Sequence, residues 1–518
     1  MELMVNKEAV TINEVAYDGC VQQPVSCDLM LPDYCPDILR VLRCDIDAKV
    51  TSKQIIGEKL VIDGTANIKL LYIDDAKLLR SHEHKLPFDV GIELKNAAEG
   101  AAAEVKVITD YVNCRPVSQR RLDIKGSLSV CAMVTAPKTE QVVAEVSGMN
   151  VEVKRKMEKV SRVVASVTHA FTVKEELEVS YGKASVASVV RANGACVVTD
   201  TKLIANKIIL KAELSGHILY LGDDKTGSAE KMEFTLPVSQ IVDANGVTEE
   251  SQCRLNLNVG GITTEVRGNN DGEARVLALN IDVVCNAVAY QNAEVPAITD
   301  LYSTKYKSTF SAKPVTFEKL AAVIGNEYTY KTTYDLPEAK NGDVLDVWSD
   351  VVIKSSKVEN GELIVNGNVK SSMLTLQDND ENGCYERGSD MEYRVRVDSN
   401  DPNLMASCDA AVKNTQFTMS GKDKIEVRVT LFINASVFSR SKENVVTDVA
   451  VNENEVKKTN ESAALVIYFA EANESVWDIA KRYNTSANQI ANSNELTGDA
   501  INERCMLLIP NAAISDEN

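Results

Sequence analysis

The stretch Ile425-Glu426-Val427-Arg428-Val429-Thr430-Leu431 shows most directly how this chain folds. Apolar and polar side chains alternate along it, and successive side chains of a β-strand point to opposite faces of the sheet. One face of this strand therefore enters a core while the other faces water. Residues 122–130 and 275–283 alternate in the same way, although less regularly. The pattern predicts antiparallel sheets, which commonly have one covered face and one solvated face.

Turn-forming dipeptides separate these strand patterns. Asn-Gly and Asp-Gly readily adopt the positive φ angles that two-residue hairpin turns require. We therefore expect a mainly β fold of antiparallel sandwich-like or barrel-like domains, each with at most one short helix. The dipeptides are Asp63-Gly64, Asn193-Gly194, Asn245-Gly246, Asp271-Gly272, Asn360-Gly361 and Asn366-Gly367.

Sequence landmarks recur at intervals of about 150 residues, which indicates three diverged copies of one domain. The copies predict β domains at residues 1–145, 146–300 and 301–440. If the alignment is right, Leu60 and Leu363 occupy equivalent strands. The matched segments are 60–64 with 363–367, 71–75 with 219–223, 86–88 with 236–238, and 232–234 with 391–393.

Composition argues against several functional classes. The chain has 518 residues, with 56 Lys and Arg against 75 Asp and Glu, so its net charge is −19. This charge repels phosphate backbones and anionic lipid surfaces. Only 5% of residues are aromatic and only 4 are His, which leaves little material for base stacking or acid–base catalysis. Motifs of nucleotide-binding loops, serine hydrolases and zinc proteases are absent. We expect a non-enzymatic protein with no cofactor, no nucleic-acid partner and no direct membrane insertion.

The cysteines and the N-terminus indicate a cytoplasmic protein. Residues 1–8 lack the basic start and long apolar stretch of a secretory signal, and no later run has the roughly 18 apolar residues of a membrane helix. The twelve cysteines extend from Cys20 to Cys505 without a C-x-x-C pair. Such spacing favours reduced, structural thiols over a disulfide framework or a zinc site. We expect the thiols to be unpaired.

The C-terminal part changes character. Residues 441–462 are dense in Lys, Glu, Asn and Val, lack aromatics, glycine and clear periodicity, and predict a solvated linker. Residues 463–512 then predict a small β-α-α-β domain, in which Ser475 with Asp478 and Ser486 with Gln489 mark two helix starts. Apolar strands flank the helices at 465–469 and 506–509.

Two parts of the sequence resemble known families. Tyr468, the helix 475–483, the stretch 490–496 and the terminal 507–510 together resemble a LysM domain. The segment Leu31-Pro32-Asp33-Tyr34-Cys35-Pro36-Asp37-Ile38 resembles the signature of SPOCS-type domains of clostridial spore-coat proteins. The third copy keeps Leu336-Pro337 and 343–345, whereas the second copy lacks the signature. We interpret Asp33 and Asp37 as turn-capping residues.

The combination resembles the clostridial spore-coat morphogenetic proteins that bind the basement-layer ATPase of the coat. The resemblance implies a non-catalytic scaffold in the mother-cell cytoplasm at the forespore surface, with that ATPase and possibly other coat proteins as partners. A second hypothesis is a binding protein for cell-wall glycans of the peptidoglycan or chitin type. LysM domains that hold such glycans usually carry Ser-Gly-Asp-Thr after the first strand. Here the loop is Ala472-Asn473-Glu474-Ser475, without glycine, and Asn502-Glu503 replaces the usual Pro-Gly. These departures favour a protein ligand.

The partner-binding surface is predicted on the first strand and the following loop and helix. Residues 465–469 are apolar at every position, although a two-stranded sheet covered on one side can bury only half of them. Trp477 lies off the apolar stripe of its helix, and tryptophan is enriched in binding hot spots. The alternative is a Trp477 partly buried against the linker. The predicted partner-binding residues are Leu465, Ile467, Asn473, Glu474, Ser475 and Trp477.

Overall fold

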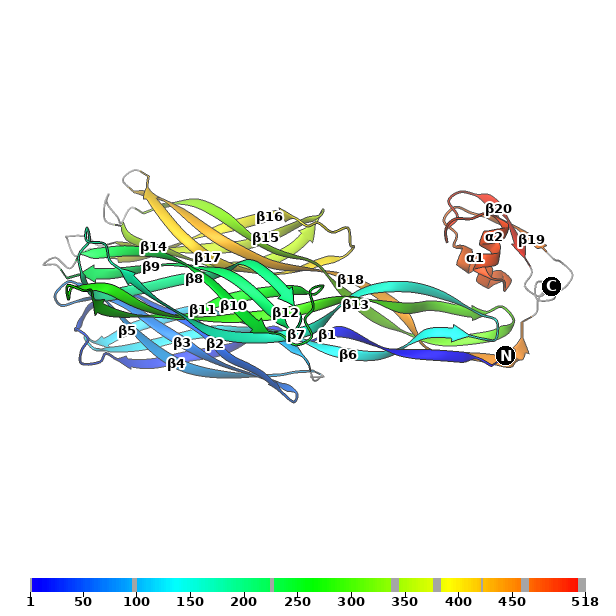
Figure 1. Cartoon of the computed structure of the whole chain (residues 1–518), viewed down its shortest axis with the longest axis horizontal. Helices are drawn as coiled ribbons and strands as arrows, with labels where there is room; N and C mark the ends of the chain where they lie inside the picture. The colour runs from blue at the N-terminus through cyan, green and yellow to red at the C-terminus, as the bar shows by residue number, and fades with distance from the viewer. Residues whose placement is uncertain are drawn as a thin grey trace.

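The computed structural model describes residues 2–95, 100–223, 228–336, 344–375, 383–420, 423–457 and 465–510. Antiparallel sheets dominate these residues, as predicted, and no sheet closes into a barrel. Figure 1 shows an elongated molecule, with a thick β head at one end, a narrower bundle of long strands, and a small helical module beside the tip of that bundle.

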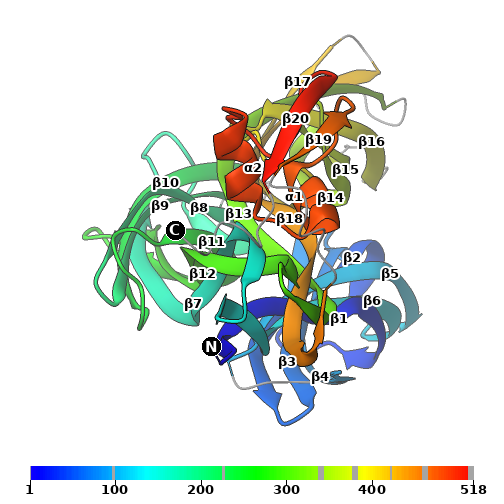
Figure 2. The ribbon, with the colours of Figure 1, turned by 90° about the vertical axis from the view of Figure 1, so that its right-hand side faces the viewer.

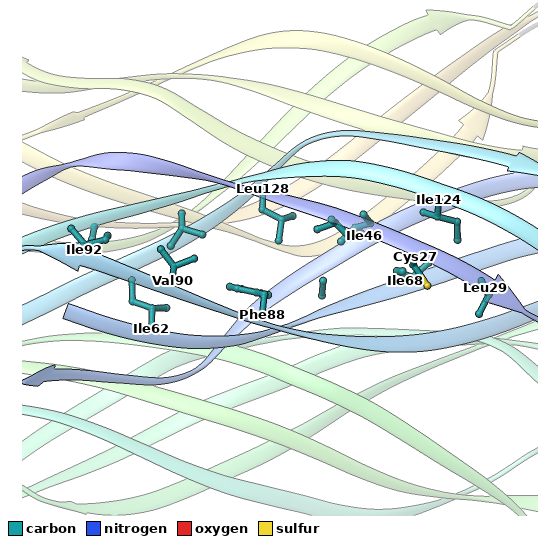
Figure 3. Close-up of a cluster of buried hydrophobic side chains, with 14 of the residues drawn as sticks. Cys27, Leu29, Ile46, Ile62, Ile68, Phe88, Val90, Ile92, Ile124 and Leu128 are labelled. Carbon is teal, nitrogen blue, oxygen red and sulfur yellow. The ribbon is translucent and has the colours of Figure 1, made fainter. Parts of the chain in front are cut away.

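The first unit is a sandwich of two three-stranded sheets. Their strand orders are β1-β6-β5 and β2-β3-β4. The central strand β3 alternates buried and partly exposed side chains, as expected for a strand that covers a core on one face. Figure 3 shows this core, in which Ile62, Ile68 and Ile124 lie between the sheets. The strands are β1 (Met4–Met30), β2 (Ile38–Ile56), β3 (Lys59–Asp74), β4 (Leu79–Glu93), β5 (Ala102–Ser118) and β6 (Arg121–Ser147).

The second and third units repeat this topology strand for strand. Their sheets have the orders β11-β12-β7 and β10-β9-β8, then β13-β18-β17 and β14-β15-β16. The strands of the second unit are β7 (Val151–Glu178), β8 (Val186–Ile204), β9 (Lys207–Gly222), β10 (Ala229–Asp243), β11 (Gln252–Gly268) and β12 (Ala274–Ser303). Those of the third are β13 (Tyr306–Asp335), β14 (Val344–Glu359), β15 (Glu362–Thr375), β16 (Gly383–Arg396), β17 (Leu404–Met419) and β18 (Lys424–Val456).

The register of the central strands confirms most of the repeat alignment. Leu60 and Leu363 are the second residues of β3 and β15, and both are fully buried. The match of 232–234 with 391–393 is wrong, because Met391 pairs with Gly367 whereas Met232 pairs with Ile218, six residues further along the equivalent central strand. A slip by an even number of residues keeps every side chain on the same face, so the apolar pattern alone does not reveal it.

Three of the six turn dipeptides lie within strands instead of turns. Asp63-Gly64, Asn193-Gly194 and Asn366-Gly367 belong to β3, β8 and β15. Gly64 pairs directly with Phe88, whose ring occupies the space that a side chain at position 64 would need. The tertiary fold therefore uses this glycine for a close approach between strands.

The predicted linker is also corrected. Residues 441–456 form the second half of β18 and pair with the first half of β13. Val445 and Val446 are fully buried there, although the neighbouring residues are polar. Residues 458–462 of the predicted linker lie outside the described residues. The chain passes between units at residues 148–150 and 304–305, close to the boundaries predicted near 145 and 300.

The long strands extend beyond the sandwiches as three two-stranded ribbons, β1–β6, β7–β12 and β13–β18, which together form what we call the stalk (Figure 1). The ribbons share an apolar core because each turns several apolar side chains inward. That core comprises Val10, Val142, Val160, Val295, Ala297, Val315, Phe317 and Val445, followed by Val143, Val146, Ile298, Leu301 and Val446.

The three units lie around a common axis, which Figure 2 shows nearly end-on. Leu71, Leu219 and Leu374 occupy equivalent positions of β3, β9 and β15, opposite Arg43, Arg191 and Asp346 of the neighbouring strands. The leucines belong to one apolar cluster that also contains Trp348. The three copies thus form one pseudo-threefold head, with a core between the units as well as within them.

The prediction that every thiol is unpaired is wrong for one pair. Cys20 and Cys131 form a disulfide between β1 and β6, where they are directly opposite each other. The other ten cysteines are free. Sequence spacing gave no sign of this pair because the two residues are 111 positions apart and meet only through strand register.

Thiol counting should therefore give ten free thiols in protein unfolded without reductant, and twelve after reduction. The Cys20→Ser variant should show one more free thiol than the native chain, since it releases Cys131. Alkylation before and after reduction, read by mass spectrometry, measures both numbers. Twelve free thiols in the unreduced native protein would contradict the pairing.

Candidate binding site on the C-terminal module

The C-terminal module has the predicted β-α-α-β order. It consists of β19 (Leu465–Ala470), α1 (Val476–Tyr483), α2 (Ala487–Ser493) and β20 (Cys505–Pro510), with β19 antiparallel to β20. Ser475 and Ser486 stand at the helix N-caps, but neither side chain forms a capping hydrogen bond. The core of the module lies between the helices and one face of the sheet and includes Ala470, Val476, Ile479, Ala480, Ile490, Leu507 and Ile509.

The other face of the sheet is apolar and exposed. Ile467 and Phe469 are 59% and 63% exposed, and they lie directly opposite Leu508 and Met506. The prediction that the all-apolar first strand leaves side chains in water is thus confirmed. We call this surface the apolar face; it consists of Leu465, Ile467, Phe469, Met506 and Leu508.

Three members of the apolar face, Phe469, Met506 and Leu508, were not among the predicted binding residues. The sequence contained the necessary signal, because residues 505–509 are also apolar at every position. The argument for two-sided exposure of the first strand applies equally to its antiparallel partner.

Trp477 is not part of this exposed surface, so its predicted place at the centre of a partner-binding site is wrong in this structure. Its side chain is only 5% exposed. The indole Nε1 donates a hydrogen bond to Asp300 Oδ2 at 2.8 Å, and the ring stands edge-on to Tyr302 with the centroids 4.9 Å apart. Both partners belong to β12 of the stalk, not to the linker. The position of Trp477 off the apolar stripe of its helix is thus covered by another part of the same chain.

The loop after β19 binds mainly to its own module. Asn473 adopts a φ of 69°, in the left-handed region that usually favours glycine. Its N–H donates to Ile501 O at 2.7 Å, and Ile501 N donates to Glu474 O at 2.9 Å. This loop is therefore joined to the loop before β20 through the backbone, and an isolated β-bridge between Ser475 and Ala500 continues the contact.

Glu474 is engaged by neighbouring donors. Its carboxylate accepts hydrogen bonds from Glu471 N at 2.9 Å and from the Tyr468 hydroxyl at 2.8 Å. These two bonds, the backbone bond first, lower the pKa of Glu474. A carboxylate held in this way has less capacity left for a ligand. Of the predicted binding residues, Leu465 and Ile467 lie on the apolar face, and Asn473 is exposed in the loop. The half-buried Glu474 bonds within its own module, the Ser475 hydroxyl is buried, and the Trp477 indole points to the stalk.

The chemistry of the module favours binding by apolar contact. No group of three or more His, Cys, Asp and Glu side chains that could hold a metal ion occurs within the described ranges. A contiguous apolar surface on a very small domain is typical of an interaction site.

Neither helix of the described chain has the length and apolar character that a membrane crossing needs.

The signature segment 31–38 forms a loop between β1 and β2 that is held by one arginine. The Arg120 guanidinium donates to Pro32 O at 2.7 Å, to Cys35 O at 3.1 Å and to Asp37 Oδ1 at 2.6 Å. Asp37 therefore anchors the loop through an ion pair with Arg120, while Tyr34 is 82% exposed to solvent.

The second unit has the same loop although it lacks the signature. Arg275 donates to Ser180 O at 3.2 Å and to Lys183 O at 2.9 Å, as Arg120 does to the carbonyls of residues 32 and 35. The loop sequences do not show this equivalence, because it depends on an arginine beside the start of the last strand of each unit. In the third unit Leu336 takes the place of Leu31, while residues 337–343 lie outside the described residues.

Comparisons with known families agree with this geometry. The family model "SipL, SPOCS domain" matches residues 37–117 and 185–267, which correspond to β2–β5 and β8–β11. The LysM domain model matches residues 471–510. No curated protein and no solved structure gives a significant match. The chain therefore carries SPOCS domains of the SipL type and a C-terminal LysM domain, a combination consistent with a spore-related LysM protein.

Proposed function

We propose that this protein is a non-catalytic scaffold of spore morphogenesis that attaches the coat to the forespore surface. Its LysM domain binds the basement-layer ATPase of the coat, in the mother-cell cytoplasm, and other coat proteins are further candidate partners. The domain families support a sporulation-related scaffold or glycan-binding role. The observation that favours a protein partner is the apolar face on β19 and β20.

The apolar face has the properties of a protein-docking surface. Its residues lie on paired strands and not on a loop, so binding needs little ordering of the backbone. Phe469 and Met506 form one directly opposed pair, and Ile467 and Leu508 form the next. A partner that covers these pairs gains free energy from the apolar area removed from water. The module lies beside the stalk tip, away from the bulk of the head (Figure 1), where a large partner can approach it.

Glycan binding is less well supported by the loops. Sugar recognition depends on polar groups that are free to hydrogen-bond, and here backbone groups of Asn473, Glu474 and Ile501 bond to one another. The Glu474 carboxylate is likewise occupied by Tyr468 and Glu471. These contacts leave fewer donors and acceptors for a sugar.

The Ile467→Glu variant tests the proposal. A charge at the centre of the apolar face should weaken binding of the full chain to the purified ATPase by roughly thirtyfold or more, since removing a central hot spot typically costs about 2 kcal/mol or more. Ile241→Glu is a matched control, because Ile241 of β10 is an equally exposed isoleucine, at 56%. Isothermal titration calorimetry measures both affinities, and circular dichroism verifies that both variants fold.

Equal affinities for native chain, Ile467→Glu and Ile241→Glu would contradict binding through the apolar face. A sedimentation assay with insoluble peptidoglycan addresses the second function. If the chain sediments with peptidoglycan, binds the ATPase no better than a control protein does, and loses sedimentation on substitution of Asn473, the glycan-binding function replaces the scaffold proposal.

A further inference from the structure

The LysM domain contacts the stalk through a carboxylate with several donors around it. Asp300 of β12 accepts the Trp477 indole N–H at 2.8 Å and the Lys481 ammonium at 2.7 and 2.8 Å. Trp477 and Lys481 are four residues apart on α1 and therefore lie on one face of the helix. One carboxylate thus holds one face of the helix through an ion pair with Lys481 and a hydrogen bond from the Trp477 indole.

Tyr302, two residues further along β12, adds an apolar contact and a second hydrogen bond. Its ring is 2% exposed and belongs to the same apolar cluster as Trp477, Ile479 and Ala480. Its hydroxyl donates to Thr485 O at 2.7 Å. Burial raises the pKa of Tyr302, so the hydroxyl remains a donor throughout the physiological pH range. Lys457 contributes at the margin by donating to Asn484 Oδ1 at 2.9 Å.

A β-bulge directs Asp300 toward the LysM domain, and the other two ribbons have the same bulge. The register shifts at Thr299 between β12 and β7, at Ala144 between β6 and β1, and at Thr447 between β18 and β13. Bulges commonly re-aim the adjacent side chain. An acidic residue follows the bulge in every unit; these three residues are Glu145, Asp300 and Asp448.

Only the second unit combines this acid with an aromatic residue. At the position of Tyr302 the first and third units have Ser147 and Ala450. Glu145 pairs instead with Arg155 at 3.8 Å, and Asp448 pairs with Lys7 at 3.1 Å. The pseudo-threefold stalk therefore offers three similar acidic positions, of which one is built to receive a helix that carries Trp and Lys four residues apart.

We propose that Asp300 and Tyr302 form an intramolecular docking site that fixes the orientation of the LysM domain on the stalk. Trp477 is then a positioning residue, which acts by holding the domain and not by touching the partner. The docked helix α1 covers the opposite side of the module from the apolar face, so docking leaves that face open. The docking site does not depend on the proposed function. Only its consequence, that the apolar face stays open to a partner, rests on the proposed function.

The Asp300→Ala variant tests the docking site in the full chain. Trp348→Phe leaves Trp477 as the single tryptophan, so that time-resolved fluorescence anisotropy reports its motion. With Asp300 intact, the anisotropy should decay with the rotational correlation time of the whole 56.6 kDa chain. In Asp300→Ala, a short component with the correlation time of the small module should dominate. Asp448→Ala is the matched control, because it removes the equivalent acid of the third unit and should leave the decay unchanged.

Lys481→Ala removes the same ion pair from the module side and should give the same short component. The Met506 methyl signal provides a second readout that does not depend on the Trp348→Phe background, because it should sharpen when the domain rotates freely. An unchanged decay and an unchanged methyl line width in Asp300→Ala, or equal changes in Asp448→Ala, would overturn the proposal. A decay that depends on protein concentration would also overturn it, since the domain would then dock onto a second copy.

These results are separable from those for partner binding. Ile467→Glu should lose ATPase affinity while keeping the slow anisotropy decay, because the apolar face lies opposite the docked helix. Loss of the slow decay in Ile467→Glu would show that the two surfaces are not independent and would contradict the assigned docking site.

Discussion

The Asp346→Arg variant should lower the free energy of unfolding by about 3 to 5 kcal/mol, the usual cost of leaving a buried charge uncompensated. Asp346 has 0% exposed surface and lies 3.4 Å from both His217 Nε2 and Lys231 Nζ. These partners come from the second unit, whereas Asp346 belongs to the third. The variant therefore replaces an attraction between two units by a repulsion at the same place.

Pseudo-symmetry makes this substitution especially unfavourable. Arg43, Arg191 and Asp346 stand at equivalent positions of β2, β8 and β14. Arginine at position 346 would restore sequence symmetry and bring a third guanidinium toward the axis, where Arg191 already stacks on Trp348 at 3.6 Å. A third arginine at this position is therefore unfavourable, because like charges would be buried together near the axis.

Chemical denaturation followed by circular dichroism measures the effect, with Asp335→Arg as a control at an exposed aspartate. We expect Asp346→Arg to unfold at lower denaturant and in separate steps, because the units lose their mutual contact. Unfolding in a single transition with the native midpoint would contradict a stabilising role for Asp346.

The same carboxylate gives stability a defined pH dependence. Burial acts to raise the pKa of Asp346, but the contacts with His217, Lys231 and Arg191 outweigh it and lower the pKa below its usual range. A carboxyl group whose folded pKa is lowered contributes stability above its unfolded pKa and loses that contribution as the pH falls through the folded pKa. Asp346→Asn should therefore reduce the acid sensitivity of unfolding.

Gly216→Val should destabilise the second unit by about 3 kcal/mol or more, the upper range for overpacking. A Cβ atom at this position would lie 2.2 Å from Asn193 O and 2.9 Å from Gly194 Cα, both in the backbone of the neighbouring strand β8. Backbone atoms inside a sheet cannot move aside without breaking the strand pairing. The ring of Phe234 also covers Gly216 from β10.

Gly182→Val is the matched control, because a Cβ there meets nothing within 4 Å. Denaturant midpoints of the two variants measure the difference, and soluble yield gives an independent indication. Equal midpoints would show that the contact between β8 and β9 at Gly216 tolerates a side chain.

Much of the architecture could be predicted because it depends on local periodicity. Alternation in residues 425–431 marks a strand of any sheet with one covered face, whatever the partner strands are. The spacing of Val476, Ile479 and Ala480 likewise marks a helix of the C-terminal module. The exposed strand of the LysM domain followed from the same argument, since a small sheet cannot bury both faces.

Long-range pairing was beyond such reasoning. Residues 441–456 have the composition of a linker, yet they form a strand because β13 supplies hydrogen bonds and the other ribbons supply a core for Val445 and Val446. Cys20 and Cys131 meet only because the register of β1 and β6 places them opposite each other. Neither the strand pairing nor the cysteine pairing can be recognised from a short window of sequence.

The sequence by itself determined the mainly β character of the chain, its threefold repetition and the β-α-α-β module with an apolar outer strand, because each depends on side-chain patterns within a few residues. Only the tertiary structure decided which apolar residues remain in water. The sequence predicted that Trp477 and Ile467 are both exposed for binding. In the structure, Asp300 and Tyr302, which are far away along the chain, cover Trp477 and leave Ile467 exposed. Exposure is a property of the assembled surface, and the free energy of burying a side chain depends on whichever segment the fold brings against it.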